Sequence, residues 1–515
     1  MYKEEIEMSF MNAAKNEIDN RKILTENGAI SYATSGKYLL DMNFATSSMR
    51  NWDDNQIENA FKLAYYEDPV YAVVWLFYLR DVRGIGMGER RTFRVCMNWL
   101  VNSKYEVSKK VISLISEYGR WDDLICLVST NATLDVIKII KEQLDEDLYN
   151  FANNKPISLL AKWMPSINTS SAKTRNIAKL ICNKLEYTEK QYRQTLSKLR
   201  SYSNVVETKM SANKWSDIDY NAVPSKANLL YSDAFLRNDE DRRRNYLSNL
   251  VKGEAKINSG TLFPSDIVHK YNVRYNSHFD VTCEELWKAL PNYVKNDENT
   301  LVIRDGSGSM TSLIDNTSVS ALDVSTALAI YFAEKCSGDF YNKFITFSSR
   351  PQIVDMSQCN SLSDKLTLCY SYNDCSNTNI EKVFNLILNT AIHNKMKQED
   401  IPKNLLIISD MEFDSINHDF WSDSKTCGWN KTVFENFANK YKKAGYKLPR
   451  IIFWNIMSRT NNVPLKENEL GVALVSGFNP AVYNMVLSDN LDPYGCLIEQ
   501  LNNQRYLPVK KALED

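Results

Sequence analysis

The chain has 515 residues, a length that predicts roughly two to four domains rather than one. Its 44% hydrophobic and 24% charged residues are typical of a folded protein and exclude an intrinsically disordered one. The net charge of −1 excludes a chain-wide attraction to nucleic acid, so such a partner would need a local basic patch.

Cysteine and histidine usage narrows the classes further. The chain has ten cysteines without a CxxC pair and only four histidines, which excludes zinc-ribbon and zinc-finger spacings. It has no apolar run near 18 residues and no signal peptide, so we expect no membrane partner. Scattered thiols without an export signal indicate reduced cysteines, hence a cytoplasmic location, or a virion if the source is a virus.

The N-terminal segment, residues 1–54, has no pattern that assigns it to a domain, and residues 30–45 are more β-like or irregular than helical. Residues 55–250 are mostly helical, because apolar residues recur at spacings of three and four. The predicted helices are 71–82, 90–103, 107–118, 133–148, 174–185 and 189–202. Short connections, such as the glycine turn at 84–88, predict an all-α stack of helix pairs, although no clean repeat period is present. With the patternless junction 253–297, this domain spans residues 55–297.

From residue 298 to 515 strands and helices alternate. The strand-like runs are 300–305, 340–347, 404–410 and 449–456, and the helical runs are 321–336, 379–392 and 432–445. This alternation predicts an α/β, doubly wound, largely parallel sheet with helices on both faces.

Oxygen-bearing side chains follow two of these strands. Asp305 ends one strand and Asp410 another, and both should reach the ligand-binding edge at the carboxyl ends of the strands. Ser307 and Ser309 follow Asp305 on alternate residues, and Thr378 enters the helix at 379–392. Two carboxylates and three hydroxyls suit Mg²⁺, or another divalent cation such as Mn²⁺. A glycine turn without a ligand explains DGSGSM alone, but the five residues together favour a metal site.

These residues resemble the metal-ion-dependent adhesion site of von Willebrand factor A domains, Asp-x-Ser-x-Ser followed by Thr and Asp. The resemblance implies a Rossmann-like domain whose ion takes an acidic side chain from a protein partner. The chain departs from the pattern at Arg304, where an apolar residue is usual, and at Gly306, where a bulkier one is frequent. Arg304 should point to the opposite face of the strand from Asp305.

The helical half resembles the Ro autoantigen (TROVE) family, and more closely its uncharacterised plant and viral relatives. The resemblance is carried by LRDVRGIGMGERRTFR, SEYGRWDDLICL, LLAKWMPSIN, the run from Tyr192 to Ala227, and LFPSDIV. It implies HEAT-like helical repeats in a ring or arc, which in Ro proteins hold single-stranded RNA ends and small structured RNAs.

Residues 80–94 and 173–214 are rich in lysine and arginine, and the second stretch also contains tyrosines. Such residues suit an RNA partner, because cations pair with phosphates and tyrosines stack on bases. The candidate RNA-binding residues are Arg80, Arg83, Arg90, Arg91, Lys162, Lys173, Arg175 and Lys179. Solvated helix faces explain the same charges, and Arg80, Asp81, Glu89 and Arg91 also fit an internal ion-pair network. Trp121 and Trp163 are expected in the core.

Together these observations predict a non-catalytic RNA-binding ribonucleoprotein component with a magnesium-dependent partner site. The alternative is a metal-dependent interaction or assembly protein, including a viral structural protein, that does not bind RNA. An enzyme is not expected, because no Gly-x-Ser-x-Gly elbow, Walker loop or GxGxxG motif is present. The sequence leaves the oligomeric state, the RNA and the protein partner open.

Overall fold

The computed structural model describes residues 22–203, 205–273, 279–294, 299–314, 318–347, 350–373, 379–413, 433–464, 471–487 and 492–514. The chain divides into two compact units. The helical unit contains the described residues of 73–262, 281–291 and 503–515, and the α/β unit contains those of 1–72, 263–280 and 292–502. Among the described helices, none combines the length and the apolar character needed to cross a bilayer.

This division differs from the contiguous domains 55–297 and 298–515 expected from the sequence. Helix α2 (Tyr38–Phe44) packs on α3 (Asp54–Glu67) and on β8 (Val472–Ser476), a strand of the α/β unit. These contacts join the N-terminal segment to the α/β unit. Helix α23 (Leu507–Glu514) packs on α6 in the helical unit. Both attachments are long-range, so local patterning could not reveal them.

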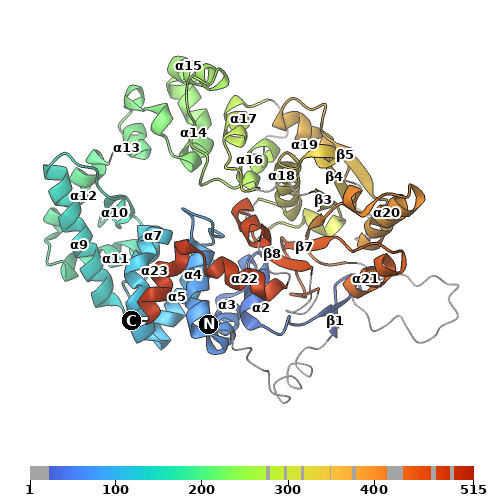
Figure 1. Cartoon of the computed structure of the whole chain (residues 1–515). Helices are drawn as coiled ribbons and strands as arrows, with labels where there is room; N and C mark the ends of the chain where they lie inside the picture. The colour runs from blue at the N-terminus through green and yellow to red at the C-terminus, as the bar shows by residue number, and fades with distance from the viewer. Residues whose placement is uncertain are drawn as a thin grey trace. The chain divides into compact units, whose positions relative to one another are not determined.

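The helical unit is built from short and medium helices that follow one another in chain order (Figure 1). They are α4 (Pro69–Arg80, whose first turn belongs to the α/β unit), α5 (Arg91–Ser103), α6 (Tyr105–Val111), α7 (Ile115–Tyr118), α8 (Trp121–Ile125), α9 (Thr133–Ala152), α10 (Leu160–Trp163), α11 (Ala172–Lys184), α12 (Glu189–Tyr202), α13 (Val206–Ser211), α14 (Ser225–Asn238), α15 (Glu240–Val251) and α17 (Val281–Lys288). The helix expected at 107–118 is divided into α6, a short 3₁₀ turn (Ile112–Leu114) and α7. The other predicted helices are present, with ends shifted by a few residues.

Apolar side chains at helical spacing form the cores between neighbouring helices. One such cluster joins α13, α14 and α15 through buried residues that include Val206, Phe235 and Tyr246. Tyr220 packs edge-on against Phe235, with ring centroids 5.3 Å apart. Trp121, expected in the core, is 7% exposed.

The α/β unit is organised around a six-stranded sheet in the order β5-β4-β3-β6-β7-β8. Its strands are β3 (Thr300–Asp305), β4 (Lys343–Phe347), β5 (Gln352–Asp355), β6 (Asn404–Ser409), β7 (Arg450–Asn455) and β8 (Val472–Ser476). The other elements of this unit are β1 (Lys22–Leu24), β2 (Ile30–Tyr32), α16 (Pro264–Val273), α18 (Ala321–Ala333), α19 (Leu362–Ser371), α20 (Ile380–His393), α21 (Val433–Lys443) and α22 (Pro493–Leu501). Only the β4–β5 pair is antiparallel within this sheet.

The four predicted strands form the centre of the sheet, as their continuous apolar runs indicated. Every residue of β3 and β6 is buried. Helix α18 packs on β3, β4 and β6, and α20 packs on β4 and on α21. The sheet is therefore mostly parallel and covered by helices, as expected.

Residues 30–45 are better ordered than their sequence indicated. β1 and β2 form an antiparallel hairpin, and Tyr32 exchanges backbone hydrogen bonds with Val463. The second half of the segment is helix α2, not strand or irregular structure, because Leu39, Leu40 and Phe44 supply a buried face at helical spacing.

Candidate functional site

The two carboxylates that were predicted at strand ends, Asp305 and Asp410, lie where the order of the strands in the sheet reverses. β3 pairs with β4 on one side and with β6 on the other, so the chain order reverses between β3 and β6. Asp305 is the last residue of β3, and Asp410 directly follows β6. In open α/β sheets this crevice, beyond the carboxyl ends of the strands, is the usual ligand site.

Asp305 is fully buried and fixed by two donors. Its Oδ1 accepts the backbone N–H of Ser307 at 2.9 Å, and its Oδ2 accepts the hydroxyl of Ser409 at 2.6 Å. The hydroxyls of Ser307 and Ser309 lie 2.9 Å apart. The DGSGS loop therefore folds back and gathers both serine oxygens beside its own carboxylate.

Asp410 is also fully buried and belongs to the same cluster. It interacts with the Ser309 side chain, and its Oδ1 accepts the backbone N–H of Glu412 at 3.2 Å. The guanidinium of Arg459, in the loop after β7, lies 3.3 Å from its Oδ2. Thus Asp305, Ser307, Ser309 and Asp410 converge as the sequence predicted.

Burial raises the pKa of the Asp305 carboxyl. Burial, together with the nearby charge of Asp305, raises the pKa of Asp410 to about 7, although Ser309 and Arg459 act in the opposite direction. Two adjacent buried carboxylates repel each other, and a cation between them would relieve the repulsion. The electrostatics of the cluster therefore favour a positively charged ligand.

The backbone beside Asp410 is held in an unusual conformation. Met411 has φ +63°, the left-handed region that non-glycine residues seldom adopt. Its N–H donates to the Ser409 hydroxyl at 3.0 Å, and its carbonyl accepts from the Asn462 amide at 3.2 Å. Residues held this way cluster at binding and active sites, because the surrounding structure must enforce them.

Glu412 anchors the same loop. Its buried carboxylate accepts the backbone N–H groups of Arg459 and Thr460, both at 2.9 Å, and that of Glu26 at 2.8 Å. The Ser458 hydroxyl donates at 3.2 Å. Glu412 thus ties the loop after β6 to the loop after β7 and to the turn of the β1–β2 hairpin, so it is structural rather than solvated.

Two further residues considered with the predicted site, Thr378 and Arg304, are not part of the cluster that the structure describes. Thr378 lies outside the described residues, so its place in the cluster stays a prediction. Arg304 points away from Asp305 as strand alternation requires, and its buried guanidinium donates to Thr326 of α18 at 3.1 Å. A buried cation replaces the usual apolar residue there, and it does not bind the cluster.

Sequence reasoning missed Ser409 and Arg459. Ser409 precedes Asp410, and the only sequence signal for its role was a serine hydroxyl at the end of a strand. Arg459 follows the strand next to β6, so the rule that selected the two aspartates also pointed to this loop.

The donor set suits a hard cation. Among the described residues, no group of three or more His, Cys, Asp or Glu side chains is arranged to hold a metal. Two carboxylates with two hydroxyls are instead an oxygen-only set, the kind that Mg²⁺ prefers when waters complete its shell. The residues present therefore fit Mg²⁺ or Mn²⁺.

The candidate RNA-binding residues of the helical unit have different environments. Arg80 is 3% exposed, and its Nε donates to the buried carboxylate of Asp123 at 2.8 Å. It is not available to a phosphate, so its assignment as an RNA-binding residue is not supported. Arg80 does belong to an internal ion pair, as the alternative held, but the partner that the structure shows is Asp123 rather than Asp81 or Glu89. The sequence could not distinguish the two because Asp123 lies 43 residues away.

Arg83, Arg90 and Arg91, between α4 and α5 and at the start of α5, are exposed. On α11, Lys173 and Lys179 are exposed, and Lys179 lies 3.8 Å from Glu189. These five side chains remain accessible to a ligand.

Lys162 and Arg175 are partly committed to the fold. The Lys162 ammonium lies 3.5 Å from Glu207, and Arg175 donates to the carbonyl of Thr169 at 3.1 Å. Trp163 is only partly buried, and the Arg120 guanidinium lies over its ring at 4.1 Å from the centroid. Trp163 is thus a stacking surface for a cation of the protein itself.

Known proteins resemble the chain along most of its length. Residues 25–106 and 133–302 match a family described as a domain of unknown function (DUF2828), and residues 299–503 match another (DUF7788). Uncharacterized protein L728 of Acanthamoeba polyphaga mimivirus is 29% identical over 94% of this chain and 88% of its own. A crystal structure of the Deinococcus radiodurans RO (RSR) protein matches with a TM-score of 0.41 and 13% identity, over 81% of this chain and 92% of that one. The two family matches meet near residue 300.

Proposed function

We propose that the protein is a non-catalytic binding protein whose α/β unit captures an acidic ligand through a divalent cation. The carrying observation is the convergence of Asp305, Ser307, Ser309 and Asp410 at the reversal of strand order. Their oxygens would hold Mg²⁺ or Mn²⁺ directly or through water. A bound cation supplies an exchangeable position for an oxygen of the ligand.

This arrangement supports the resemblance to a von Willebrand A domain with an adhesion-type metal site. In that reading the ligand oxygen is a carboxylate of a partner protein, or of a second copy of the chain.

Asp305→Asn tests the metal. Asparagine can keep both hydrogen bonds of Asp305, since its oxygen accepts from Ser307 and its amide donates to Ser409. Without a divalent cation the variant should be more stable than the wild type by on the order of 1 kcal/mol, because like-charge repulsion with Asp410 is removed. With Mn²⁺ at about 100 times its dissociation constant, the wild type should gain about 2.7 kcal/mol and the variant little.

The measurements are thermal unfolding in EDTA and in Mn²⁺, and titration of free Mn²⁺ by electron paramagnetic resonance. Asp355→Asn on β5, which removes an exposed carboxylate elsewhere on the sheet, is the matched control and should bind Mn²⁺ as the wild type does. A peptide with one aspartate should bind the Mn²⁺-loaded protein, and its asparagine counterpart should not. Equal Mn²⁺ binding by the wild type and Asp305→Asn would refute the site.

We propose RNA as a second ligand, held by the helical unit. The supporting observation is the exposure of Arg83, Arg90, Arg91, Lys173 and Lys179, and the sequence resemblance to the Ro family favours single-stranded ends or small structured RNA. The alternative remains a metal-dependent assembly protein that does not touch RNA. Location in the cytoplasm, or in a virion, stays a prediction.

The double variant Lys173→Glu/Lys179→Glu tests RNA binding on α11. Each lost phosphate contact should reduce the slope of log affinity against log salt by about 1. Lys138→Glu, an exposed cation on α9 outside the candidate set, is the control. Crosslinking that recovers no RNA from the wild type would favour the assembly protein.

A further inference from the structure

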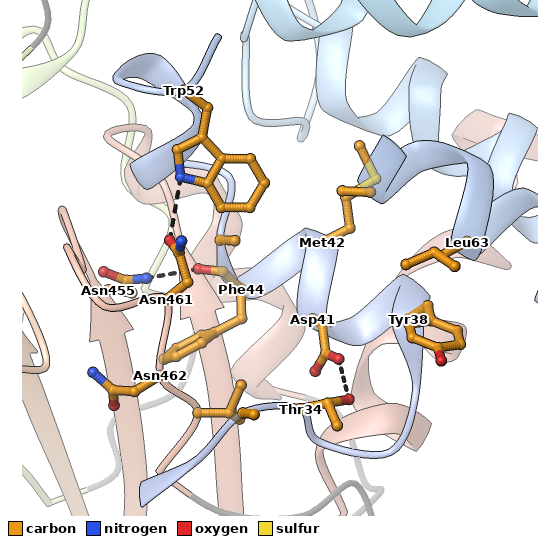
Figure 2. A pocket seen from close by; sticks show the side chains of 14 residues that line it. Thr34, Tyr38, Asp41, Met42, Phe44, Trp52, Leu63, Asn455, Asn461 and Asn462 are labelled. Carbon is orange, nitrogen blue, oxygen red and sulfur yellow. Dashed lines mark hydrogen bonds between the residues drawn. The ribbon is translucent and has the colours of Figure 1, made fainter. Parts of the chain in front are cut away.

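A pocket separate from the aspartate cluster lies where the N-terminal segment meets the carboxyl end of β7 (Figure 2). It has a volume of about 210 Å³, and its walls come from residues 33–45, Trp52, α3 and the loop at 455–463. Asp305, Ser307, Ser309 and Asp410 do not line it. Ligand sites for drug-sized molecules usually measure about 300–1,000 Å³, so this pocket suits one side chain or a small organic ion.

Aromatic and apolar side chains form much of the wall. Tyr38 and Leu63 are 39% and 49% exposed, so two large, mostly apolar side chains of the pocket wall are accessible to solvent. Trp52 stands opposite them in Figure 2, and its indole Nε1 donates to Asn461 at 3.2 Å. That bond orients the indole ring, so part of the wall is set before a ligand arrives.

One acid lines the pocket, the partly buried Asp41 of α2. It accepts hydrogen bonds from the Thr34 hydroxyl and from the Ser35 N–H, the latter at 2.7 Å, and it also interacts with the Ser35 side chain. A carboxylate offers about four lone-pair positions, so roughly one remains. Within the described part of the chain, no lysine or arginine forms an ion pair with Asp41.

The charged surroundings of Asp41 are acidic. Glu67 of α3 is close enough to raise the pKa of Asp41, after the larger effect of burial, and together they bring it to about 6. The Lys37 ammonium lies 3.8 Å from Glu67, where it offsets that charge rather than the charge of Asp41. At neutral pH Asp41 is thus mostly ionised without a cation of its own.

We propose that this pocket binds a guanidinium group, with Asp41 as the anion and Tyr38 and Trp52 as the aromatic walls. A guanidinium is planar and weakly hydrated, stacks on aromatic faces, and donates charge-assisted hydrogen bonds to a carboxylate. An ammonium is a compact, strongly hydrated charge and uses the aromatic walls less well. The occupant is an arginine side chain of a partner peptide, which matches the volume of the pocket.

The test is calorimetric titration of the full-length protein at pH 7.5 with blocked arginine, N-acetyl-arginine amide. The neutral isostere N-acetyl-citrulline amide should bind at least about tenfold more weakly, and n-butylguanidinium reports whether the charged group alone suffices. Binding of blocked arginine alone supports a peptide ligand, and binding of both cations supports a guanidinium site that also accepts free small guanidines.

Two variants assign the binding to this pocket. Asp41→Asn should lower the affinity at least about tenfold, and Tyr38→Ala, at an exposed position that should not affect folding, about threefold, the size of an exposed cation–π contact. Glu58→Gln on α3 removes one negative charge outside the pocket and should change nothing. Far-ultraviolet circular dichroism checks the fold of each variant.

Three results would overturn the proposal. The first is citrulline binding as tight as arginine binding, which would mean that charge is not recognised. The second is affinity unchanged in both Asp41→Asn and Tyr38→Ala. The third is absence of saturable binding by either cation up to roughly 10 mM. Because Asp305→Asn leaves this pocket intact, loss of the metal site and loss of this site are distinguishable.

Discussion

Asp123→Ala should strongly destabilise the helical unit, because this carboxylate is the shared anion of a buried ion-pair network. Asp123 is fully buried and accepts the Arg80 Nε at 2.8 Å, the Arg94 Nε at 2.7 Å and the backbone N–H of Arg120 at 2.9 Å. The substitution leaves the Arg80 guanidinium buried without an anion. Removing one partner of a buried pair costs about 3–5 kcal/mol, a large part of the stability of a domain.

The neighbouring Asp122→Ala is the matched control. Asp122 also pairs with Arg94 and Arg120, each at 2.8 Å, but its side chain is 22% exposed. Water therefore weakens these pairs, and the expected loss is about 1 kcal/mol. The double variant Arg80→Met/Asp123→Ala should recover part of the lost stability, since a methionine replaces the buried charge with an apolar side chain.

Urea unfolding measures the loss in the free energy of unfolding for each variant. Hydrogen exchange of the backbone amides in α4 and α8 locates that loss in the helical unit. Equal losses for Asp122→Ala and Asp123→Ala would refute the reasoning, as would a loss below about 1 kcal/mol for Asp123→Ala. An additional loss in the double variant would mean that Arg80 stabilises the fold without its anion.

Three further predictions follow from individual contacts. The folded state holds the proton of Asp41 with a pKa of about 6, above the ordinary 3.8, so wild-type stability should fall as pH rises from about 4 to above 6. Asp410, with its pKa raised to about 7, contributes to the same decline, so chemical denaturation should show a decline in Asp41→Asn that is smaller than in the wild type by up to about 3 kcal/mol. Gly119→Ala places a Cβ 2.7 Å from the Asp123 carboxylate and should cost about 1–3 kcal/mol in thermal unfolding. Arg505→Ala removes the pair with buried Asp81, 3.2 Å away, and should accelerate hydrogen exchange in α23 more than in α9.

The centre of the α/β unit could be predicted because its strands are continuous apolar runs. β5 and β8 were not predicted. β5 has four residues at a sheet edge, mostly exposed, so it lacks an apolar run. β8 is a run of five buried residues, and periodicity cannot distinguish so short a run from a piece of helix.

The aspartate cluster could be predicted in part because a parallel sheet brings the ends of its strands to one edge. Asp305 and Asp410, 105 positions apart in the sequence, were placed together by that rule alone. The rule selects strand ends but not their hydrogen bonds, so the roles of Ser409 and Glu412 needed the structure. The Arg80 pair was hidden for the same reason, since ion-pair partners on different helices carry no sequence spacing.

The buried acids of this protein fall into two groups, those whose charge is compensated within the protein and those whose charge is not. This difference identifies candidate binding residues better than burial alone. Asp123 is matched by guanidinium groups, and Glu412 is surrounded by backbone and hydroxyl donors, so neither needs an outside partner. Among the described residues, Asp410 pairs with one guanidinium, that of Arg459 at 3.3 Å, and Asp305 has hydrogen-bond donors and the nearby charge of Arg304 but no ion pair. In the same part of the chain, Asp41 has only the neutral donors of Thr34 and Ser35. An acid whose charge the described chain leaves uncompensated is where an external cation gains most, because the desolvation of that acid has already occurred on folding. The same reasoning therefore leads to a divalent metal at one edge of the sheet and to an organic cation between aromatic walls.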